Sequence, residues 1–331
     1  MSLQKKVLVT GGAGYIGSHV CKALHTHGHI PIAFDNLSTG HKSFVKWGPL
    51  HQGDITNAND LNDAFMKHRP DMVMHLAASA YVRESVADPM KYYVNNCVGS
   101  LRLLDAMQCH GVHHIVVSST CAVYGDCKSL PIDESTEKDP QSPYGRSKLF
   151  VEQALHDLGK ASDLKWVALR YFNAAGADPD LEIGEDHTPE THIIPLTIQA
   201  ALGKAPALQI FGNDFDTPDG TAIRDYVHVN DLATAHVNAM TYLENGGASD
   251  PFNLGTGNGT SIKDILDTVK RLSGKEVPHA IATRSPGDVP ALYASAERAK
   301  QHLNWSPTQS SLDNIIKTAL NWHRHHRTGN D

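Results

Sequence analysis

Tyr144 and Lys148 are the two residues whose types and spacing point most directly to proton transfer. Ser142 followed by Pro143 is typical of a helix start, with the serine as N-terminal cap and the proline as first helical residue. Tyr144 and Lys148 then lie one turn apart on the same face of that helix. Because a fixed ammonium group favours the ionised phenol, we expect the pKa of Tyr144 to fall below its ordinary value of about 10. The same spacing occurs among ordinary surface residues, so the surrounding elements decide whether the pair is catalytic.

A glycine-rich turn near the N-terminus predicts a dinucleotide site. The apolar run Val7–Thr10 is followed by Gly11, Gly14 and Gly17 and then by a helical pattern. Glycines at this spacing permit a tight turn, the close approach of a pyrophosphate and close packing of the helix on the strand. The helix N-terminus then faces the phosphates. The alternative interpretation is a glycine-rich loop without a ligand.

Asp35 favours the dinucleotide interpretation and indicates which cofactor is bound. It ends a second predicted strand, Pro31–Asp35, where an acid accepts hydrogen bonds from the ribose hydroxyls of the adenosine. A carboxylate there also repels a 2′-phosphate, and no arginine occurs in the turn that follows. That turn consists of Asn36, Leu37, Ser38, Thr39 and Gly40. The sequence therefore predicts NAD rather than NADP.

Further candidate contacts follow later strands. Asp54 is expected near the adenine edge of the cofactor. The predicted strand 71–75 leads into a turn near the cofactor's middle, formed by Leu76, Ala77, Ala78 and Ala80. In a predicted helix over about 89–110, Asn95 and Asn96 either face a ligand or are solvated, since asparagine is a poor helix former. Thr120 ends the strand His114–Thr120, where it either caps the strand or contacts a substrate oxygen.

The order of these elements predicts the fold. Strands and helices alternate over the first ~170 residues, which indicates an α/β fold with a doubly wound parallel sheet. We expect an NAD-binding Rossmann domain over residues 1–173, with a contribution from about 224–250. Residues 174–331 have shorter elements and loops rich in Gly, Pro and acidic residues. They predict a smaller, discontinuous α/β domain that binds the substrate.

Composition excludes several other classes of protein. The 331 residues carry a formal charge of −7, and no basic run stands out, which argues against nucleic-acid binding. No apolar run reaches the ~18 residues of a membrane span, and the predicted first strand leaves no room for a signal peptide. Five cysteines without a Cys-x-x-Cys pair predict a cytoplasmic protein with reduced thiols. The tract His323–His326 has no matching ligand spacing, so no metal site is predicted.

Together these motifs resemble the UDP-glucose 4-epimerase family of the extended short-chain dehydrogenase/reductase superfamily, over nearly the whole chain. The matching segments are Gly11–His19, Asp35–Leu37, Gly53–Ile55, Glu84–Val86, Tyr92–Asn96, Val123–Gly125, Pro140–Leu149, Leu169–Asn173, Gly184–Asp186, Ile210–Asp214, Arg224–His228, Asn253–Gly255 and Gly287–Asp288. So many segments in one order are more specific than any single motif.

The resemblance implies roles by position. Tyr144 would be the acid and base, Lys148 its electrostatic partner, and Thr120 the hydroxyl that bonds the sugar O4. The residues that would line NAD are Tyr15, Ile16, residues 35–40, Asp54, Ile55, Asn95 and Phe172. The residues that would hold the uridine diphosphate are Asn173, His192, Arg224, Arg284 and Asp288. Family members also suggest a homodimer formed through helices within 89–110 and 143–160.

Three positions depart from the family pattern. Ala80 stands where many relatives carry a lysine near the cofactor phosphates. Binding of those phosphates is therefore expected to be weaker, or to be shared with Arg83. His192 stands where some relatives have asparagine. Leu292 stands where a bulky tyrosine narrows the sugar pocket of glucose-restricted relatives, which leaves room for the 2-acetamido group of UDP-N-acetylglucosamine.

Four alternatives stay open to different degrees. A UDP-arabinose/xylose 4-epimerase would share every catalytic residue. A nucleotide-sugar 4,6-dehydratase would need an Asp-Glu pair after the strand-end threonine, where this sequence has Cys121 and Ala122. An ordinary NAD-dependent dehydrogenase would accumulate NADH. A non-catalytic NAD-sensing protein would commonly lack Tyr144 or Lys148.

Overall fold

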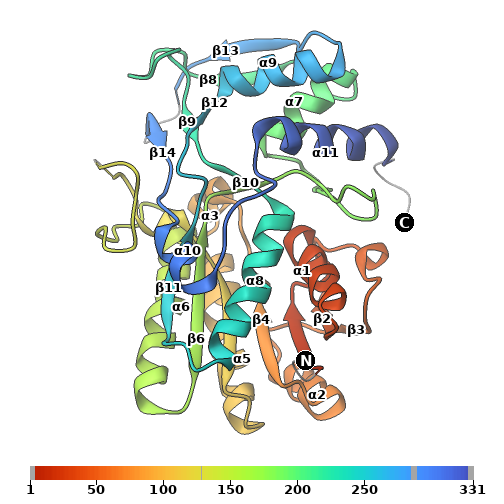
Figure 1. Ribbon diagram of the computed structural model, residues 1–331, viewed down its shortest axis with the longest axis vertical. Helices are drawn as coiled ribbons and strands as arrows, with labels where there is room; N and C mark the ends of the chain where they lie inside the picture. The colour runs from red at the N-terminus through yellow and green to blue at the C-terminus, as the bar shows by residue number, and fades with distance from the viewer. Residues whose placement is uncertain (1–3, 128, 285–288, 327–331) are drawn as a thin grey trace.

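A seven-stranded sheet forms the larger part of the protein. The computed structural model describes residues 4–127, 129–284 and 289–326. The strand order is β11-β6-β5-β4-β1-β2-β3, and all neighbours pair in parallel. The strands are β1 (Lys6–Thr10), β2 (Ile30–Asp35), β3 (Leu50–Gln52), β4 (Met72–His75), β5 (His114–Thr120), β6 (Lys165–Tyr171) and β11 (Asp250–Leu254). The sheet and its helices occupy the lower part of Figure 1.

Helices cover both faces of this sheet. On one face lie α1 (Tyr15–Thr26) and α8 (Val229–Glu244); on the other lie α2 (Ala58–His68), α5 (Gly99–Cys109) and α6 (Pro143–Ala161). Strand β1 shows the alternation: Val7 and Val9 pack in the core under α1, and Leu8 packs in the opposite core. Since both faces are buried, successive strand residues are all apolar. The predicted doubly wound parallel sheet is confirmed.

The strand order reverses between β1 and β4. The chain proceeds outward from β1 to β2 and β3 on one side, and from β4 to β5, β6 and β11 on the other. At this point the turn after β1 meets the turn after β4. Gly11 has a φ of +72°, and a Cβ there would lie 2.8 Å from the backbone nitrogen of Ala77. In sheets of this type, ligands bind beyond the carboxyl ends of the strands at such a reversal.

A second group of elements lies beyond those carboxyl ends, in the upper part of Figure 1. Its helices α7 (Ile193–Leu202), α9 (Ile262–Ser273) and α11 (Leu312–His325) share one core. Its strand pairs and triplet are β7 (Asn173–Ala175) with β10 (Tyr226–His228), β8 (Leu208–Phe211) with β13 (His279–Ala282), and β12 (Thr260–Ser261), β9 (Ile223–Arg224) and β14 (Ala291–Leu292). The domain boundary at residue 173 stays a prediction.

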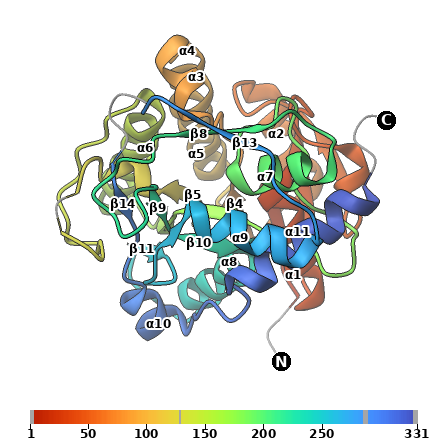
Figure 2. The same cartoon turned by 90° about the horizontal axis from the view of Figure 1, so that it is seen from above.

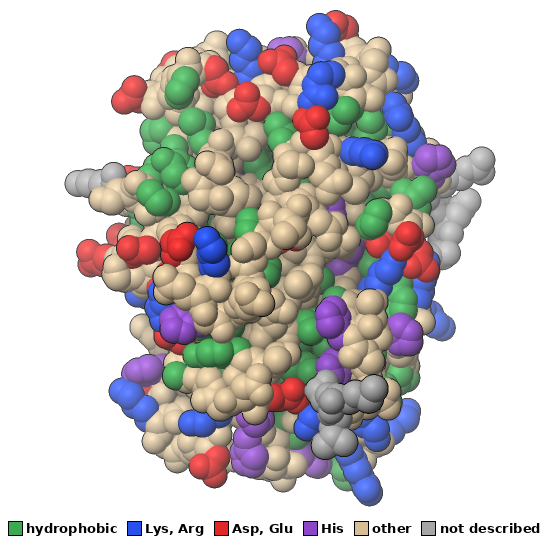
Figure 3. Space-filling view, in the orientation of Figure 1, with side chains coloured by type: hydrophobic (Ala, Val, Ile, Leu, Met, Phe, Trp, Pro, Cys, Tyr) green, Lys and Arg blue, Asp and Glu red, His purple; other side chains and the backbone are tan. Residues whose placement is uncertain are grey.

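The remaining elements border these two groups. They are the helices α3 (Val82–Ala87), α4 (Pro89–Tyr92) and α10 (Glu297–Leu303), the π-helix η2 (Tyr93–Val98) and the 3₁₀ turns η1 (Lys42–Phe44) and η3 (Cys121–Val123). No helix within the described residues is long and apolar enough to cross a membrane. On the face in Figure 3, acidic and basic side chains are interspersed without a continuous basic surface.

Candidate active site

The predicted catalytic residues come together at the carboxyl end of β5. Ser142 caps α6 by accepting a hydrogen bond from the backbone nitrogen of Gly145 at 3.1 Å, as predicted. The Lys148 ammonium, 4% exposed, donates to the carbonyl oxygen of Ser118 at 2.9 Å. Two residues further along the strand, the Thr120 hydroxyl lies near enough to the Tyr144 phenol to lower its pKa. A phenol, a hydroxyl and an ammonium group therefore share one small region.

The expected effect of Lys148 on Tyr144 is wrong for the protein without cofactor. Burial raises the pKa of Tyr144 to about 12, and the neighbouring Thr120 hydroxyl only partly opposes this rise. Burial also lowers the pKa of Lys148 to about 8, against the charges of Glu152 and Cys97. Spacing along a helix gives proximity, but here desolvation of both groups dominates their titration.

A buried ion pair fixes α6 against the sheet one turn beyond Lys148. The Arg170 guanidinium on β6 donates to both carboxylate oxygens of Glu152, and the two side chains are only 2% and 6% exposed. The Ser119 hydroxyl donates to the same carboxylate, and Arg170 also donates to the Tyr124 hydroxyl at 2.8 Å. These residues were not predicted. They hold the helix that carries the phenol and the ammonium group.

Asn96 is a second positioning residue, and it is one of the two helical asparagines that the sequence left open between a ligand and solvent. It lies in the π-helix η2 and is buried, whereas Asn95 donates to it at 3.0 Å. Its side chain accepts from the backbone nitrogen of Ser79 at 2.8 Å and donates to the Ser79 carbonyl and to the Ser147 hydroxyl, each at 3.0 Å. Asn96 thus joins the turn after β4 to α6. A wide π turn is a frequent feature of functional sites.

The glycine turn has the geometry that a pyrophosphate requires. Gly14 precedes α1 without a side-chain cap, and the first turn of the helix holds no acidic residue. A Cβ at Gly17 would lie 2.0 Å from the Gly11 carbonyl oxygen, so the tight turn depends on glycine. Amide groups at an uncapped helix start favour anions. The turn therefore fits NAD.

The other predicted cofactor residues border this turn. Asp35 accepts hydrogen bonds from the backbone nitrogens of Ala13 and Leu37 at 3.0 and 2.8 Å, and Gly40 lies beside its carboxylate. Asp54 accepts from Asn36 at 2.9 Å. The remaining residues follow β2, begin α1, follow β3 and β4, or end β6; they are Ser38, Thr39, Tyr15, Ile16, Ile55, Leu76, Ala78, Ala80 and Phe172.

Three predicted substrate residues lie on neighbouring short strands. Asn173 on β7 donates to the carbonyl oxygen of Asp225 at 2.9 Å. Arg224 on β9 pairs in register with Leu292 on β14. Leu292 also packs against the cluster that includes Cys121 and Phe172. The structure therefore brings Leu292 close to the residues that follow Thr120 and β6.

Two predicted substrate residues lie at the edges of the described chain. The Arg284 guanidinium stacks on the ring of Phe215, 3.9 Å from its centre, and lies 3.8 Å from a carboxylate oxygen of Asp214. Asp288 lies outside the described residues.

His192 precedes α7 and belongs to a cluster that the sequence did not predict. Its Nδ1 contacts the carboxylate of Glu185, and the cluster also contains His187 and Glu190. Burial lowers the pKa of His187, but the two neighbouring glutamate carboxylates outweigh it and raise that pKa to about 9. The spacing His-x-x-Glu-x-His in a Gly- and Pro-rich loop was the available signal.

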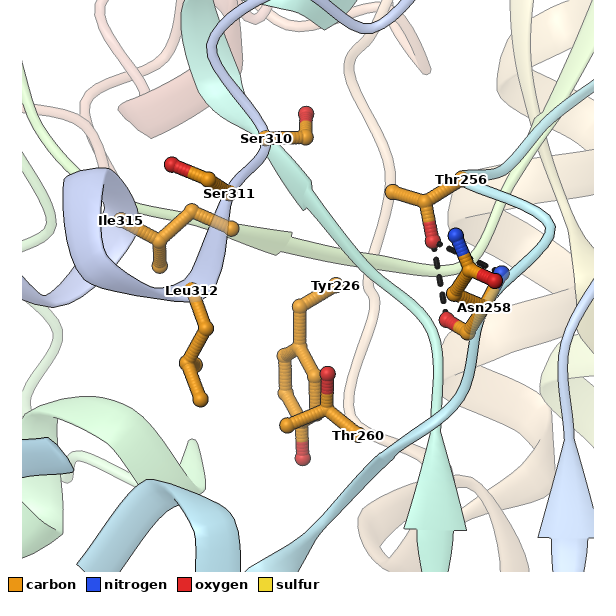
Figure 4. Close-up of a pocket in the computed structure, with 8 residues that line it drawn as sticks. All are labelled: Tyr226, Thr256, Asn258, Thr260, Ser310, Ser311, Leu312 and Ile315. Atoms are coloured by element: carbon orange, nitrogen blue, oxygen red, sulfur yellow. Dashed lines mark hydrogen bonds between the residues drawn. The ribbon is translucent and has the colours of Figure 1, made fainter. Parts of the chain in front are cut away.

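A separate cavity of about 210 Å³ lies between β10, residues 256–260 and the start of α11 (Figure 4). It is lined by Tyr226, Thr256, Asn258, Thr260, Ser310, Ser311, Leu312 and Ile315. The Thr256 hydroxyl donates to the backbone oxygen of Asn258 and accepts from its nitrogen, as the dashed lines show. None of the predicted catalytic residues lines this cavity, so it is distinct from the site of proton transfer.

Comparison with known proteins identifies the family of this chain. The model of the NAD dependent epimerase/dehydratase family matches residues 7–255, more than half of the chain. The chain belongs to this family. Its members include a UDP-glucose 4-epimerase of Rhizobium leguminosarum bv. trifolii, 49% identical over 317 residues, which cover 96% of this chain and 97% of the relative.

Solved structures of family members agree. A UDP-glucose 4-epimerase from Brucella ovis in complex with NAD is 50% identical, with a TM-score of 0.94, over 96% of this chain and 98% of that one. A UDP-Glc/GlcNAc 4-epimerase from Campylobacter jejuni is 36% identical, with a TM-score of 0.85, over 97% of this chain and 100% of that one. The resemblance to the UDP-glucose 4-epimerases is confirmed.

Proposed function

We propose that this protein interconverts UDP-glucose and UDP-galactose by transient oxidation at the sugar C4, with NAD retained as cofactor. The observation that carries the proposal is the meeting of Thr120, Tyr144 and Lys148 beside the reversal of strand order. Nearly full-length similarity to UDP-glucose 4-epimerases supports the same chemistry. NAD supplies a hydride acceptor and donor when bound.

The protein's own residues supply proton transfer and orientation. Thr120 and Tyr144 are neighbours, which supports a role for both at the same sugar hydroxyl. Tyr144 removes the hydroxyl proton as the sugar is oxidised and returns it when the sugar is reduced. In this proposal the Lys148 ammonium stabilises the phenolate that forms during the exchange, against the opposing effect of burial. Asn173, His192, Arg224, Arg284 and Asp288 would hold the diphosphate while the sugar turns.

Cys121 argues against the dehydratase alternative. It directly follows Thr120, where a dehydratase needs a carboxylic acid, and burial raises the pKa of its thiol to about 12. A thiol in that state does not exchange protons readily at neutral pH. A UDP-arabinose/xylose 4-epimerase remains the main alternative, and a dehydrogenase would accumulate NADH.

Product analysis with Tyr144→Phe tests the proposed function. Incubation of the wild type with UDP-galactose should yield UDP-glucose without net change in NADH. Loss of a general acid–base commonly costs about 100-fold to 10,000-fold in rate, so Tyr144→Phe should retain NAD but lose activity to that degree. Separate incubation with UDP-arabinose distinguishes the pentose enzyme. Near-normal turnover in Tyr144→Phe would refute the assigned role.

Leu292 supports a wider sugar specificity, which extends the proposal to UDP-N-acetylglucosamine and its galactosamine epimer. Its side chain borders the cluster beside Cys121 and Phe172, and a larger residue would fill space there. Overpacking costs about 1–3 kcal/mol, so Leu292→Tyr should lower turnover of the acetylated sugar about 5- to 150-fold while sparing UDP-glucose. Undetectable wild-type turnover of the acetylated sugar would contradict this extension.

We also propose a homodimer through an apolar helical face. This face consists of exposed apolar side chains on α3, α4, η2, α5 and α6: Val82, Val86, Met90, Val94, Val98, Leu101 and Phe150. Figure 2 shows α3, α4 and α5 projecting on one side. A second copy is the occupant because the helices form one continuous surface and large exposed apolar patches mark interfaces. A cytoplasmic location is part of the proposal, and the five free cysteines fit a reducing compartment.

Met90 and Met66 provide a matched test of the dimer. They are 65% and 56% exposed, but Met66 lies on α2, outside the apolar helical face. Light scattering after size exclusion should report a dimer for the wild type and Met66→Glu, and a smaller species for Met90→Glu. A monomeric wild type would contradict the proposed assembly.

A further inference from the structure

Four side chains in the loop between β7 and α7 form a compact group, the histidine–glutamate cluster: Glu185, His187, Glu190 and His192. One donor atom from each lies within 4.8 Å of all the others. Nδ1 of His187 is 3.3 Å from Glu185 Oε1 and 3.9 Å from Glu190 Oε2. Nδ1 of His192 contacts Glu185 and lies 3.5 Å from Glu190 Oε1. The donors thus point into one shared space.

One of these donors is held by charge alone. Nδ1 of His187 is a buried atom that lies 3.3 and 3.9 Å from two carboxylate oxygens without the geometry of a hydrogen bond. Buried polar atoms are nearly always satisfied, and binding of an ion is among the common reasons for an exception. The glutamates are themselves buried, with side chains 4% and 7% exposed. An ion between the four donors would satisfy the imidazole nitrogen and both carboxylates.

Neighbouring contacts hold the ligands in place, as outer contacts do in metal sites. Oε1 of Glu190 accepts from the backbone nitrogens of Thr191 and His192 at 2.7 and 2.8 Å. The Trp322 indole donates to the backbone oxygen of Glu185 at 2.9 Å. The His187 ring meets the rings of Tyr15 and Tyr81 edge-on, with centroids 6.3 and 6.1 Å apart. These contacts limit rotation of three of the four ligands.

The donor set selects the kind of ion. Two imidazole nitrogens and two carboxylate oxygens suit Zn²⁺ and other divalent transition metals better than Mg²⁺ or Ca²⁺. Tetrahedral zinc with bonds of about 2.0–2.1 Å places its ligand atoms about 3.3 Å apart. Three of the four His–Glu separations, at 3.3, 3.5 and 3.9 Å, lie near this value. The closer contact of His192 with Glu185 must open to admit the ion.

We propose that the histidine–glutamate cluster binds one Zn²⁺ ion with four protein ligands. Sites with four protein ligands leave no position for substrate, so this ion is structural. It would bind the start of the loop to its end, where His192 precedes α7. The sequence-based prediction of no metal site considered only the His323–His326 tract. The proposal concerns an ion, and its test does not depend on the sugar that the enzyme acts on.

Metal analysis of the purified protein, without an affinity tag, tests the proposal. After incubation with zinc and extensive dialysis, mass spectrometry of the metal should find about one zinc per chain. His187→Gln and His192→Gln should retain less than about a tenth of that amount, because each removes a ligand. His326→Gln is the matched control: His326 contacts Asp186 at 2.9 Å, next to the cluster but outside it, and should leave the zinc content unchanged.

A measurement on the unaltered chain keeps the test valid if a variant misfolds. Chelator-treated wild type reloaded with Co²⁺ should develop the intense visible absorption of tetrahedral cobalt, and zinc should abolish it. Wild-type protein that retains neither ion refutes the site. Equal metal content in wild type and both ligand variants also refutes it. In that case the cluster is two ion pairs, with protons on the imidazoles in place of the metal.

Discussion

Loss of the charge of Glu152, in its buried pair with Arg170, is expected to lower the free energy of unfolding substantially. Glu152→Gln keeps the size of the side chain but leaves the Arg170 guanidinium, 2% exposed on its side chain, without a counter-charge. Breaking one partner of a buried ion pair costs about 3–5 kcal/mol, far more than the pair is worth against apolar replacements. An unfolding entropy of about 2.1 cal/mol/K per residue over the 331 residues converts this into a melting temperature lower by about 4–7 °C.

Scanning calorimetry at constant excess NAD measures this loss, with two comparisons. Glu276→Gln removes a carboxylate from an exposed pair with Lys270 and should leave the melting temperature unchanged. The double variant Glu152→Met/Arg170→Met leaves no buried charge unpaired, so it should be more stable than the sum of the two single changes by about 0.5–3 kcal/mol. Additive losses, or a Glu152→Gln shift no larger than that of Glu276→Gln, would refute this account of the network.

Two further predictions concern proton transfer and the cofactor. Turnover should fall as pH rises through about 8, where Lys148 loses its charge. The unfolded chain binds the same proton up to about 10.4, so the contribution of Lys148 to the free energy of unfolding rises between these two pH values. A loss of stability in parallel with the loss of turnover would therefore point to a different cause. Gly17→Ala should bind NAD more than tenfold more weakly because its Cβ meets the Gly11 carbonyl oxygen at 2.0 Å. NAD content after gel filtration measures this loss, and a content equal to that of the wild type would contradict the role of the turn.

Features of this chain that depend on near neighbours could be predicted from the sequence. The cap at Ser142, the helix it starts and the glycine turn are each set by a few adjacent residues. The alternation of strands and helices was enough for the parallel sheet because most of its crossovers are local; the connection from β6 to β11 is the long exception. Thr120, Tyr144 and Lys148 were found for the same reason: each stands at the end or start of a predictable element.

Features that depend on distant contacts could not be predicted in this way. The pKa of Tyr144 follows burial by the whole fold, which spacing on a helix does not reveal. Asn96 faces the site because η2 is a wide π turn, and a helical pattern does not distinguish this from an ordinary turn. The histidine–glutamate cluster lies in a loop that Lys22 holds through Asp178, 156 residues away, at 2.8 Å. No local pattern indicates where such a loop folds.

The π-helix η2 has a consequence for how the enzyme behaves on dilution. Its six residues direct Asn96 inward, to Ser79 and Ser147, and expose Val94 and Val98 on the opposite side. The residue that joins the two halves of the active site and the surface proposed to meet a second copy are therefore parts of one turn. If the two copies separate, the conformation of η2 is expected to change, because Val94 and Val98 lose their contacts with the second copy. Specific activity should then fall as the enzyme is diluted below the concentration at which the copies part, and added NAD alone should not restore it.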